Sequence, residues 1–264
     1  MTSQPGQKQI KQEKCQSWLR IMPSVITSIA MLAGFSSVLT AIEGMVYGDV
    51  EFFRWSSLLI ILALILDGLD GNLARFLNAR TRFGAELDTF VDLTAFGIAP
   101  AVLVHAATLQ DSPVLVRMLL PCFIVLMGAL RLSRFKATDP GRGIGGYTGL
   151  PITSNASWVS FFVQFAIIPP AKGMGAGLEM LFLVGVFILC ILQVSNVRYP
   201  ATSKKALYFV PTLVLAVVIW FLSFRMPDTA RWLSLIMLVS VLSYSIILPI
   251  LNLFMSRSEP EVTS

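Results

Sequence analysis

Histidine is almost absent from this sequence: His105 is the only one among 264 residues. A metal site or a catalytic pair built on histidine is therefore not expected, and His105 itself is predicted to be a helix-end residue. Cysteine is also scarce. Cys15, Cys122 and Cys190 lie far apart and form none of the short spacings that bind metal or carry redox chemistry, so we expect them to be inert packing residues.

Charged residues are also scarce in this sequence. Charged residues make up 13% of the chain, whereas a soluble domain has about 25%. Hydrophobic residues make up 55%, and the mean hydropathy is +0.75. These values predict an all-α integral membrane protein. No polar stretch is long enough to bury the core of a separate soluble domain.

The apolar runs predict about eight transmembrane helices, because a span needs about 20 mostly apolar residues. The spans are expected at 21–46, 54–78, 84–107, 114–134, 152–170, 176–196, 205–225 and 230–254. Residues 21–255 would then form one transmembrane domain. Residues 1–20 are a basic N-terminal segment, either a short helix on an anionic membrane surface or a disordered tail. Residues 256–264 are expected to be a disordered C-terminal tail.

Positive residues are distributed unevenly between the two predicted sides of the membrane. Fifteen of the 20 Lys and Arg residues lie on the side of the N-terminus. The other side has Arg54, Arg117, Lys172, Arg225 and Arg231. By the positive-inside rule, both termini are expected in the cytoplasm. The basic residues are spread over several short loops, which does not indicate nucleic-acid binding.

Four aspartates interrupt the apolar sequence between residues 67 and 92, which reads DGLDGNLARFLNARTRFGAELDTFVD. Asp67 and Asp70 are three residues apart and Asp88 and Asp92 are four apart, so each pair lies on one face of a helix. An unpaired carboxylate inside a membrane is costly, so a divalent metal ion is the expected partner. We predict two helix ends that face each other at the cytoplasmic surface, with four carboxylates directed at a cation.

This stretch resembles the signature of the CDP-alcohol phosphotransferases, Asp-x-x-Asp-Gly-x-x-Ala-Arg followed by Gly-x-x-x-Asp-x-x-x-Asp. Every fixed position is matched, by Asp67, Asp70, Gly71, Ala74, Arg75, Gly84, Asp88 and Asp92. The resemblance implies that Asp67, Asp70 and Asp88 hold the metal, and that Asp92 is the general base and can also be a ligand. It implies that Gly71, Arg75 and Gly84 contact the nucleotide and its diphosphate. The all-oxygen ligand set favours Mg²⁺ or Mn²⁺.

Three more segments on the same predicted side are expected to be functional. Arg131-Leu-Ser-Arg134-Phe-Lys136 ends the fourth span, and residues 195–200 read Ser-Asn-Val-Arg-Tyr-Pro. Between them, the glycine-rich segment 139–151 can wrap an anionic head group or serve as a flexible connector. Within the family, these segments resemble those of the integral-membrane phosphatidylserine synthases, although Thr153 replaces a proline of that pattern. Arg198 either contacts substrate or anchors a helix end at the membrane surface.

The resemblance implies transfer of a phosphatidyl group from CDP-diacylglycerol to the hydroxyl of L-serine, giving phosphatidylserine and CMP. The serine carboxylate needs a cation, and Arg134 is the first candidate, followed by Arg131, Lys136 and Arg142. The family also implies a homodimer.

Two alternatives stay open. The first is the same chemistry with another alcohol, such as glycerol 3-phosphate, inositol phosphate or choline, or with an archaeal ether-lipid donor. The second is a cation transporter that uses the four aspartates as its ion site. Against the transporter, the aspartates are predicted at one membrane face rather than at the midplane, and no inverted repeat is visible.

Overall fold

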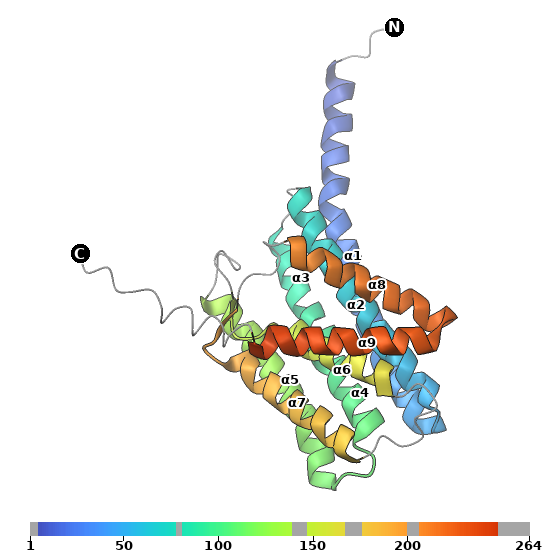
Figure 1. The fold of residues 1–264 in the computed structure, drawn as a ribbon. Helices are drawn as coiled ribbons and strands as arrows, with labels where there is room; N and C mark the ends of the chain where they lie inside the picture. Colours follow the sequence, from blue (N-terminus) through green and yellow to red (C-terminus); the bar gives the residue numbers. More distant parts are fainter. Residues whose placement is uncertain (1–4, 78–80, 139–146, 167–175, 200–205, 248–264) are drawn as a thin grey trace, which may run out of the picture.

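The computed structural model of the chain describes residues 5–77, 81–138, 147–166, 176–199 and 206–247. Within these ranges, the side chains of residues 5–21, 138, 147, 176, 198 and 206–210 are outside the description. The described chain is almost entirely helical (Figure 1). Its elements are α1 (Pro5–Tyr47), α2 (Val50–Phe76), α3 (Arg82–Leu93), η1 (Thr94–Ile98), α4 (Ala99–Thr108), α5 (Val114–Thr138), β1 (Tyr147–Thr148), α6 (Ile152–Ala166), α7 (Ala176–Val194), β2 (Arg198–Tyr199), α8 (Ala206–Arg225), α9 (Pro227–Leu242) and η3 (Ser243–Ile247).

Six of the described helical segments are long and apolar enough to cross a membrane, which supports an integral membrane protein. They are Met22–Tyr47, Val50–Phe76, Arg82–Thr108, Val114–Ala137, Gly177–Val194 and Pro227–Ile247. Each coincides with one of the eight predicted spans. The third combines α3, the π-helical turn η1 and α4 into one continuous helix.

The other two predicted spans, 152–170 and 205–225, coincide with α6 and α8. The described part of α6 has 15 residues, and Ile152, Trp158 and Phe161 are among its many buried side chains. The helix packs against α2 and α9, so protein rather than lipid surrounds most of it. In α8 the apolar stretch with described side chains is Pro211–Arg225. The count of eight spans therefore stays a prediction.

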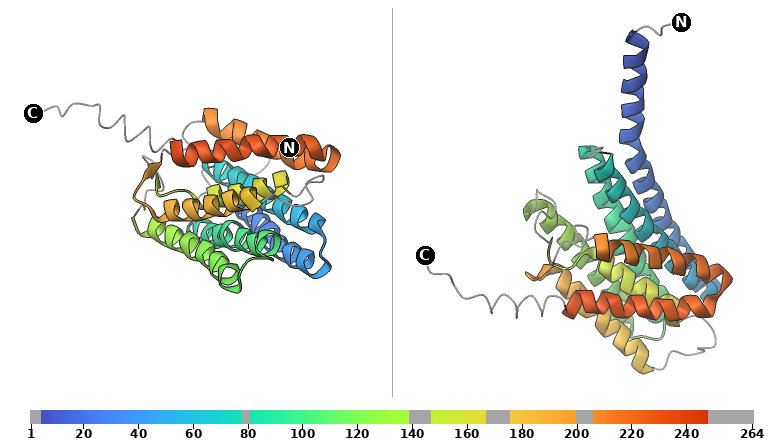
Figure 2. Two further views of the ribbon diagram at one scale, coloured as in Figure 1. Left: turned by 60° about the horizontal axis from the view of Figure 1, so that its bottom comes forward. Right: turned by 45° about the horizontal axis from the view of Figure 1, so that its top comes forward.

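Helices α8 and α9 lie together on one side of the bundle, where α9 covers α6 and α8 contacts α2 (Figures 1 and 2). The helix α1 is continuous from Pro5, and its N-terminal part projects beyond the other helices (Figure 1). The described residues of the basic N-terminal segment therefore extend the first spanning helix. Their contact with an anionic membrane surface and the domain boundaries at 20 and 255 stay predictions, and residues 256–264 lie outside the described residues.

Hydrogen bonds between distant segments define two ends of the bundle. At one end, Gln164 of α6 donates to the Arg54 carbonyl oxygen at 3.0 Å and to Ser57 Oγ at 2.7 Å, and Arg54 donates to the Ser223 carbonyl oxygen of α8. His105, in the last turn of α4, bonds the Arg117 carbonyl oxygen at 3.0 Å. The prediction of a helix-end histidine is confirmed.

The opposite end holds the C-terminal ends of α2, α5 and α7 and the N-terminal ends of α3 and α6. Lys136 of α5 forms an ion pair with Glu86 of α3, and Arg134 of α5 bonds residues at the end of α7. The aspartates and the basic residues of α5 therefore share one end, as the charge pattern predicts. The membrane side that this end faces stays a prediction.

Candidate active site

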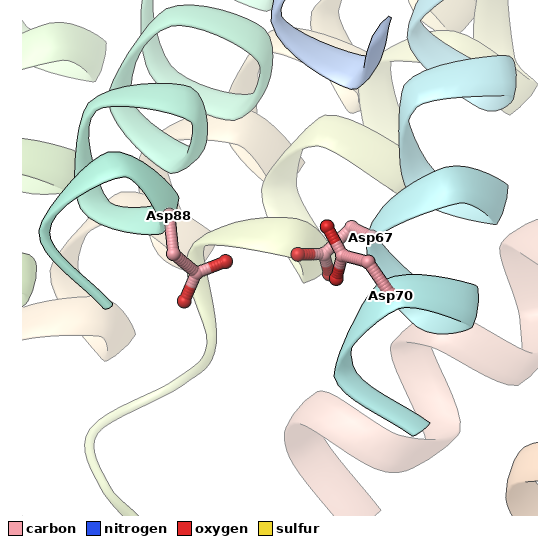
Figure 3. Close-up of side chains that lie close together, drawn as sticks. All are labelled: Asp67, Asp70 and Asp88. Atoms are coloured by element: carbon pink, nitrogen blue, oxygen red, sulfur yellow. The ribbon is translucent and has the colours of Figure 1, made fainter. Parts of the chain in front are cut away.

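The start of α3 is fixed by its N-cap. The Thr81 side chain accepts a hydrogen bond from the Gly84 amide at 3.0 Å, and the Thr81 backbone is extended. Such a cap satisfies an amide that the helix itself leaves unpaired. The chain thus turns back from α2 into α3, and Asp88 faces Asp67 and Asp70 across the gap between the two helices (Figure 3).

Three of the four aspartates come together. One carboxylate oxygen from each of Asp67, Asp70 and Asp88 lies within 4.8 Å of the others. Asp70 is only 5% exposed, and Asp67 and Asp88 are partly buried. Three carboxylates cannot stay close and ionised in an apolar bundle without a cation. Opposite ligands of an octahedral ion with bonds of about 2.1 Å lie about 4.2 Å apart, so a small side-chain shift would bring the three oxygens onto one ion, and an all-carboxylate donor set suits Mg²⁺ or Mn²⁺.

Asp92 follows Asp88 by one helical turn and is partly buried. It interacts electrostatically with Asp88, Asp70 and Arg131, and also with Asp67. Asp92 is not among the three carboxylates whose oxygens meet, and its roles as general base and as metal ligand stay predictions. The π-helical turn η1 begins two residues after Asp92, and such wide turns are frequent at functional sites.

The residues predicted to contact the nucleotide lie around the same aspartates. A Cβ added at Gly71 would meet no atom within 4 Å among the residues that the structure describes. Arg75 is exposed in the last turn of α2. A Cβ at Gly84 would lie 3.1 Å from Thr81 Oγ1 and 3.4 Å from Ser24 Oγ. An added Cβ would thus crowd the N-cap residue Thr81 and would make an ordinary contact with Ser24 of α1. The contact of Gly84 with a nucleotide stays a prediction.

The basic residues that are predicted to bind serine have different surroundings. Arg131 interacts electrostatically with Asp67 and Asp92 and lies over the Phe135 ring at 5.3 Å. Arg134 donates to the carbonyl oxygens of Val194 and Ser195 and to the Asn196 side chain. Lys136 forms the ion pair with Glu86. Arg142 and the side chain of Arg198 lie outside the described residues.

The structure brings the three other predicted segments together into one unit, here called the α5–α7 junction and made of Arg134, residues 147–150 and residues 192–199. Strand β1 pairs with β2 in antiparallel register. The Gly149 amide donates to the Val197 carbonyl oxygen at 2.8 Å, and the Leu150 amide donates to the Leu192 carbonyl oxygen at 3.0 Å. Gly149 has a φ of +82°, and a Cβ there would lie 2.2 Å from the Gln193 carbonyl oxygen, so the position requires glycine.

Tyr199 extends this junction to the last described helix. Its side chain is 1% exposed and donates to the Ser245 carbonyl oxygen in η3 at 3.0 Å. Burial raises the pKa of Tyr199 to about 12, so the phenol keeps the proton that it donates. The ends of α5 and α7 and the turn η3 that follows α9 are thereby held together.

The sequence motifs did not point to one polar residue of this site, Thr27 of α1. The Thr27 hydroxyl of α1 donates to Asp70 Oδ2. The available signal was weak: Ser24, Thr27 and Ser28 place hydroxyl groups on one face of an otherwise apolar helix.

Residues 20–191 match the sequence profile of the CDP-alcohol phosphatidyltransferases. The chain belongs to this family. The resemblance drawn from the aspartate signature is thus confirmed, and the protein is a transferase that is embedded in the membrane. The match covers α2, α3 and the three clustered aspartates. It gives no support to the cation transporter.

The chain is similar to family members whose names specify a serine acceptor. It is 30% identical over 209 residues to a CDP-diacylglycerol–serine O-phosphatidyltransferase of Helicobacter pylori, which covers 79% of this chain and 84% of the relative. A protein of the same name from Mycobacterium leprae is 37% identical over 145 residues, 52% of this chain and 45% of the relative. An archaetidylserine synthase of Methanothermobacter thermautotrophicus is 30% identical over 182 residues, 68% of this chain and 69% of the relative.

Proposed function

We propose that this CDP-alcohol phosphatidyltransferase transfers the phosphatidyl group from CDP-diacylglycerol to the hydroxyl of L-serine and releases CMP. The observation that carries the proposal is the meeting of Asp67, Asp70 and Asp88 in a chain that shares 30% identity with a serine-specific relative over 84% of that relative's length. The carboxylate cluster supports phosphoryl-transfer chemistry, and the relatives' names support the acceptor.

Asp67, Asp70 and Asp88 would hold Mg²⁺ or Mn²⁺, which when bound neutralises the diphosphate and stabilises CMP as the leaving group. No described residue lies within 4 Å of a Cβ at Gly71, which supports a place for the diphosphate next to Asp70. The exposed Arg75 guanidinium, five residues after Asp70, is suited to bidentate hydrogen bonds with phosphate oxygens. Gly84 lies one turn before Asp88 at the start of α3, and we propose that it contacts the nucleotide.

Asp92 is proposed as the general base. It accepts the proton of the serine hydroxyl while the serine oxygen forms a bond to the phosphorus that carries diacylglycerol. The bond from that phosphorus to the bridging oxygen breaks, and the oxygen leaves with CMP. A base one turn from the metal ligands, rather than among them, can reach an acceptor that approaches the diphosphate from the side opposite the leaving group.

Among the serine-binding candidates, the surroundings favour Arg131. Its charge acts on Asp92, so a serine whose carboxylate is near Arg131 can present its hydroxyl to the base. The Arg134 guanidinium instead holds the end of α7 through three acceptor oxygens. Lys136 and Arg142 remain candidates for contacts with serine or with the lipid phosphate.

A site at one end of the bundle also suits the substrates. The two acyl chains of CDP-diacylglycerol can stay in lipid while serine and CMP exchange with water. The charge pattern supports a cytoplasmic position for this end, with both termini on the same side. The homodimer is proposed from the family resemblance.

The direct test measures CMP release by the purified protein in detergent with CDP-diacylglycerol and MgCl₂. The acceptors are L-serine, glycerol 3-phosphate, inositol phosphate and choline, and Asp67→Asn is the inactive control. We expect release with serine and little release with the others. Release with a different acceptor would correct the acceptor, and release with none would refute the proposed reaction.

The archaeal relative favours a second candidate for the donor lipid, an ether-linked CDP-archaeol in place of CDP-diacylglycerol. The same assay, with L-serine fixed and each donor supplied in turn at equal concentration, distinguishes the two.

A further inference from the structure

Helix α1 contributes a polar contact to the aspartate site, although the family signature lies wholly in α2 and α3. The Thr27 hydroxyl donates to Asp70 Oδ2, a contact between residues 43 positions apart. Both residues are buried, each with 5% of its surface exposed. Water is thus largely excluded from this hydrogen bond, and the orientation of the Asp70 carboxylate depends on its protein partners.

The Thr27 hydroxyl has two acceptors within reach and one proton. Its oxygen is 2.9 Å from the carbonyl oxygen of Pro23, one turn earlier in α1, and it also contacts Asp70 Oδ2. Because a hydrogen bond to a carboxylate is roughly twice as strong as one to a neutral acceptor, the proton is directed at Asp70. A carboxylate held through one oxygen keeps its second oxygen available to a cation in a defined direction.

Helix α1 also touches the α3 half of the site. Ser24 lies one turn before Thr27, and its Oγ is 3.4 Å from the position that a Cβ on Gly84 would occupy. The Gly84 amide donates to the N-cap residue Thr81. Gly84 lies four residues, about one helical turn, before Asp88. One face of α1 therefore contacts α2 through Thr27 and α3 through Ser24. Helix α1 thus packs against both helices that carry the aspartates.

We infer that Thr27 is a positioning residue of the divalent-cation site, which fixes the Asp70 carboxylate through its hydroxyl and makes α1 the third helix of that site. The inference rests on the proposed function only in assuming that the three aspartates bind a divalent cation. Partners that orient a metal ligand in this way typically change metal affinity or activity 10–100-fold when they are removed.

The test compares Thr27→Val, which keeps the shape but removes the hydroxyl, with Thr27→Ser, which keeps the hydroxyl. The matched control is Thr40→Val in the same helix. The Thr40 hydroxyl bonds only the Ser36 carbonyl oxygen one turn earlier, at 2.7 Å, among the contacts that the structure describes. Thr40→Val therefore removes the same kind of backbone bond that Thr27→Val removes, without a bond to a carboxylate.

The primary measurement is Mn²⁺ binding to each detergent-solubilised full-length protein, from the electron paramagnetic resonance signal of free Mn²⁺. We expect Thr27→Val to weaken binding roughly 10–100-fold, Thr27→Ser to restore most of the affinity, and Thr40→Val to leave it unchanged. The Mg²⁺ concentration for half-maximal CMP release should shift in parallel. If Thr27→Val does not fold while Thr40→Val does, Thr27→Ala replaces it.

Wild-type affinity in Thr27→Val, or equal loss in Thr27→Ser and Thr27→Val, would overturn the inference, as would absence of Mn²⁺ binding by the wild-type protein. Failure of the proposed reaction gives a different pattern. In that case the wild-type protein binds Mn²⁺ but releases no CMP with serine, and the Mn²⁺ titrations still decide the role of Thr27.

Discussion

Arg134 Nη1 donates to the backbone carbonyl oxygen of Val194, the last residue of α7, at 2.8 Å. The same atom lies 3.2 Å from the Ser195 carbonyl oxygen. Carbonyl groups in the last turn of a helix have no partner within the helix, and a guanidinium satisfies them while opposing the negative end of the helix dipole. Arg134 thus holds α5 to α7 at the end of the bundle that carries the aspartates.

The first prediction separates the two arginines of α5. Arg131→Ala should raise the KM for serine at least tenfold, because the charge of Arg131 acts on Asp92, the proposed base, and we propose that it binds the serine carboxylate. Arg134→Ala should lower the melting temperature and kcat while the KM for serine stays within about threefold, since charge-assisted hydrogen bonds contribute about 1.5–3 kcal/mol each. Steady-state kinetics and thermal unfolding of both variants provide the comparison. A selective rise in the KM for serine with Arg134→Ala would reverse the assignment.

The second prediction concerns the ion pair between Lys136 and Glu86. Their side chains are 39% and 65% exposed, so the pair should contribute only about 0–1 kcal/mol to stability. Glu86→Gln should therefore change neither stability nor turnover. Lys136→Met removes the same pair and also any contact with substrate. A loss of turnover in Lys136→Met but not in Glu86→Gln would assign a substrate contact to Lys136, and equal losses would show that the ion pair itself matters.

The third prediction tests the close contact between α1 and the π-helical turn that follows Asp92. A Cβ at Gly34 would lie 2.6 Å from Ala95 Cα and Cβ. Gly34→Ala should destabilise the protein by about 1–3 kcal/mol and lower turnover, because the turn must shift. Gly177→Ala in α7 is the control, since a Cβ there meets no described atom within 4 Å and alanine is the better helix former. Equal thermal stability of the two variants would contradict a tight α1–η1 contact.

Spacing and hydropathy were sufficient to predict the long helices and the aspartate cluster. A separation of three or four residues places two side chains on one helical face whatever the tertiary structure, so Asp67 and Asp70 pair locally. Only the short segment between Phe76 and Arg82 separates the two helices, which forces the helix carrying Asp88 to turn back beside them. The carboxylate cluster therefore depends on local geometry that the sequence encodes directly.

Contacts between distant segments could not be predicted in the same way. A threonine in an apolar helix commonly bonds its own backbone one turn earlier, so the hydroxyl-bearing face of α1 only weakly indicates that Thr27 also contacts a carboxylate 43 residues away. The Arg134 guanidinium reaches an acceptor 60 residues away, and a flexible side chain of that length has many possible targets. The burial of α6 depends on α2 and α9, which hydropathy alone does not reveal.

The fourth prediction tests the proposed base. Asp92→Asn should reduce turnover with serine by about 10²–10⁴-fold, because the amide cannot accept the hydroxyl proton. Binding of CDP-diacylglycerol should be largely retained, since Asp67, Asp70 and Asp88 are intact. Turnover and nucleotide-lipid binding are measured on the same preparation. Near-normal turnover would exclude the base role. Loss of both turnover and CDP-diacylglycerol binding would indicate that Asp92 is needed to hold the metal.

The central claim is that carboxylates of α2 and α3 bind the divalent cation. The most direct measurement is an anomalous difference map from crystals grown with MnCl₂ and recorded at the manganese absorption edge. The account predicts a peak within about 2.5 Å of oxygens of Asp67, Asp70 and Asp88. A map from Mn²⁺-containing crystals with these carboxylates well ordered and no peak between them would contradict it.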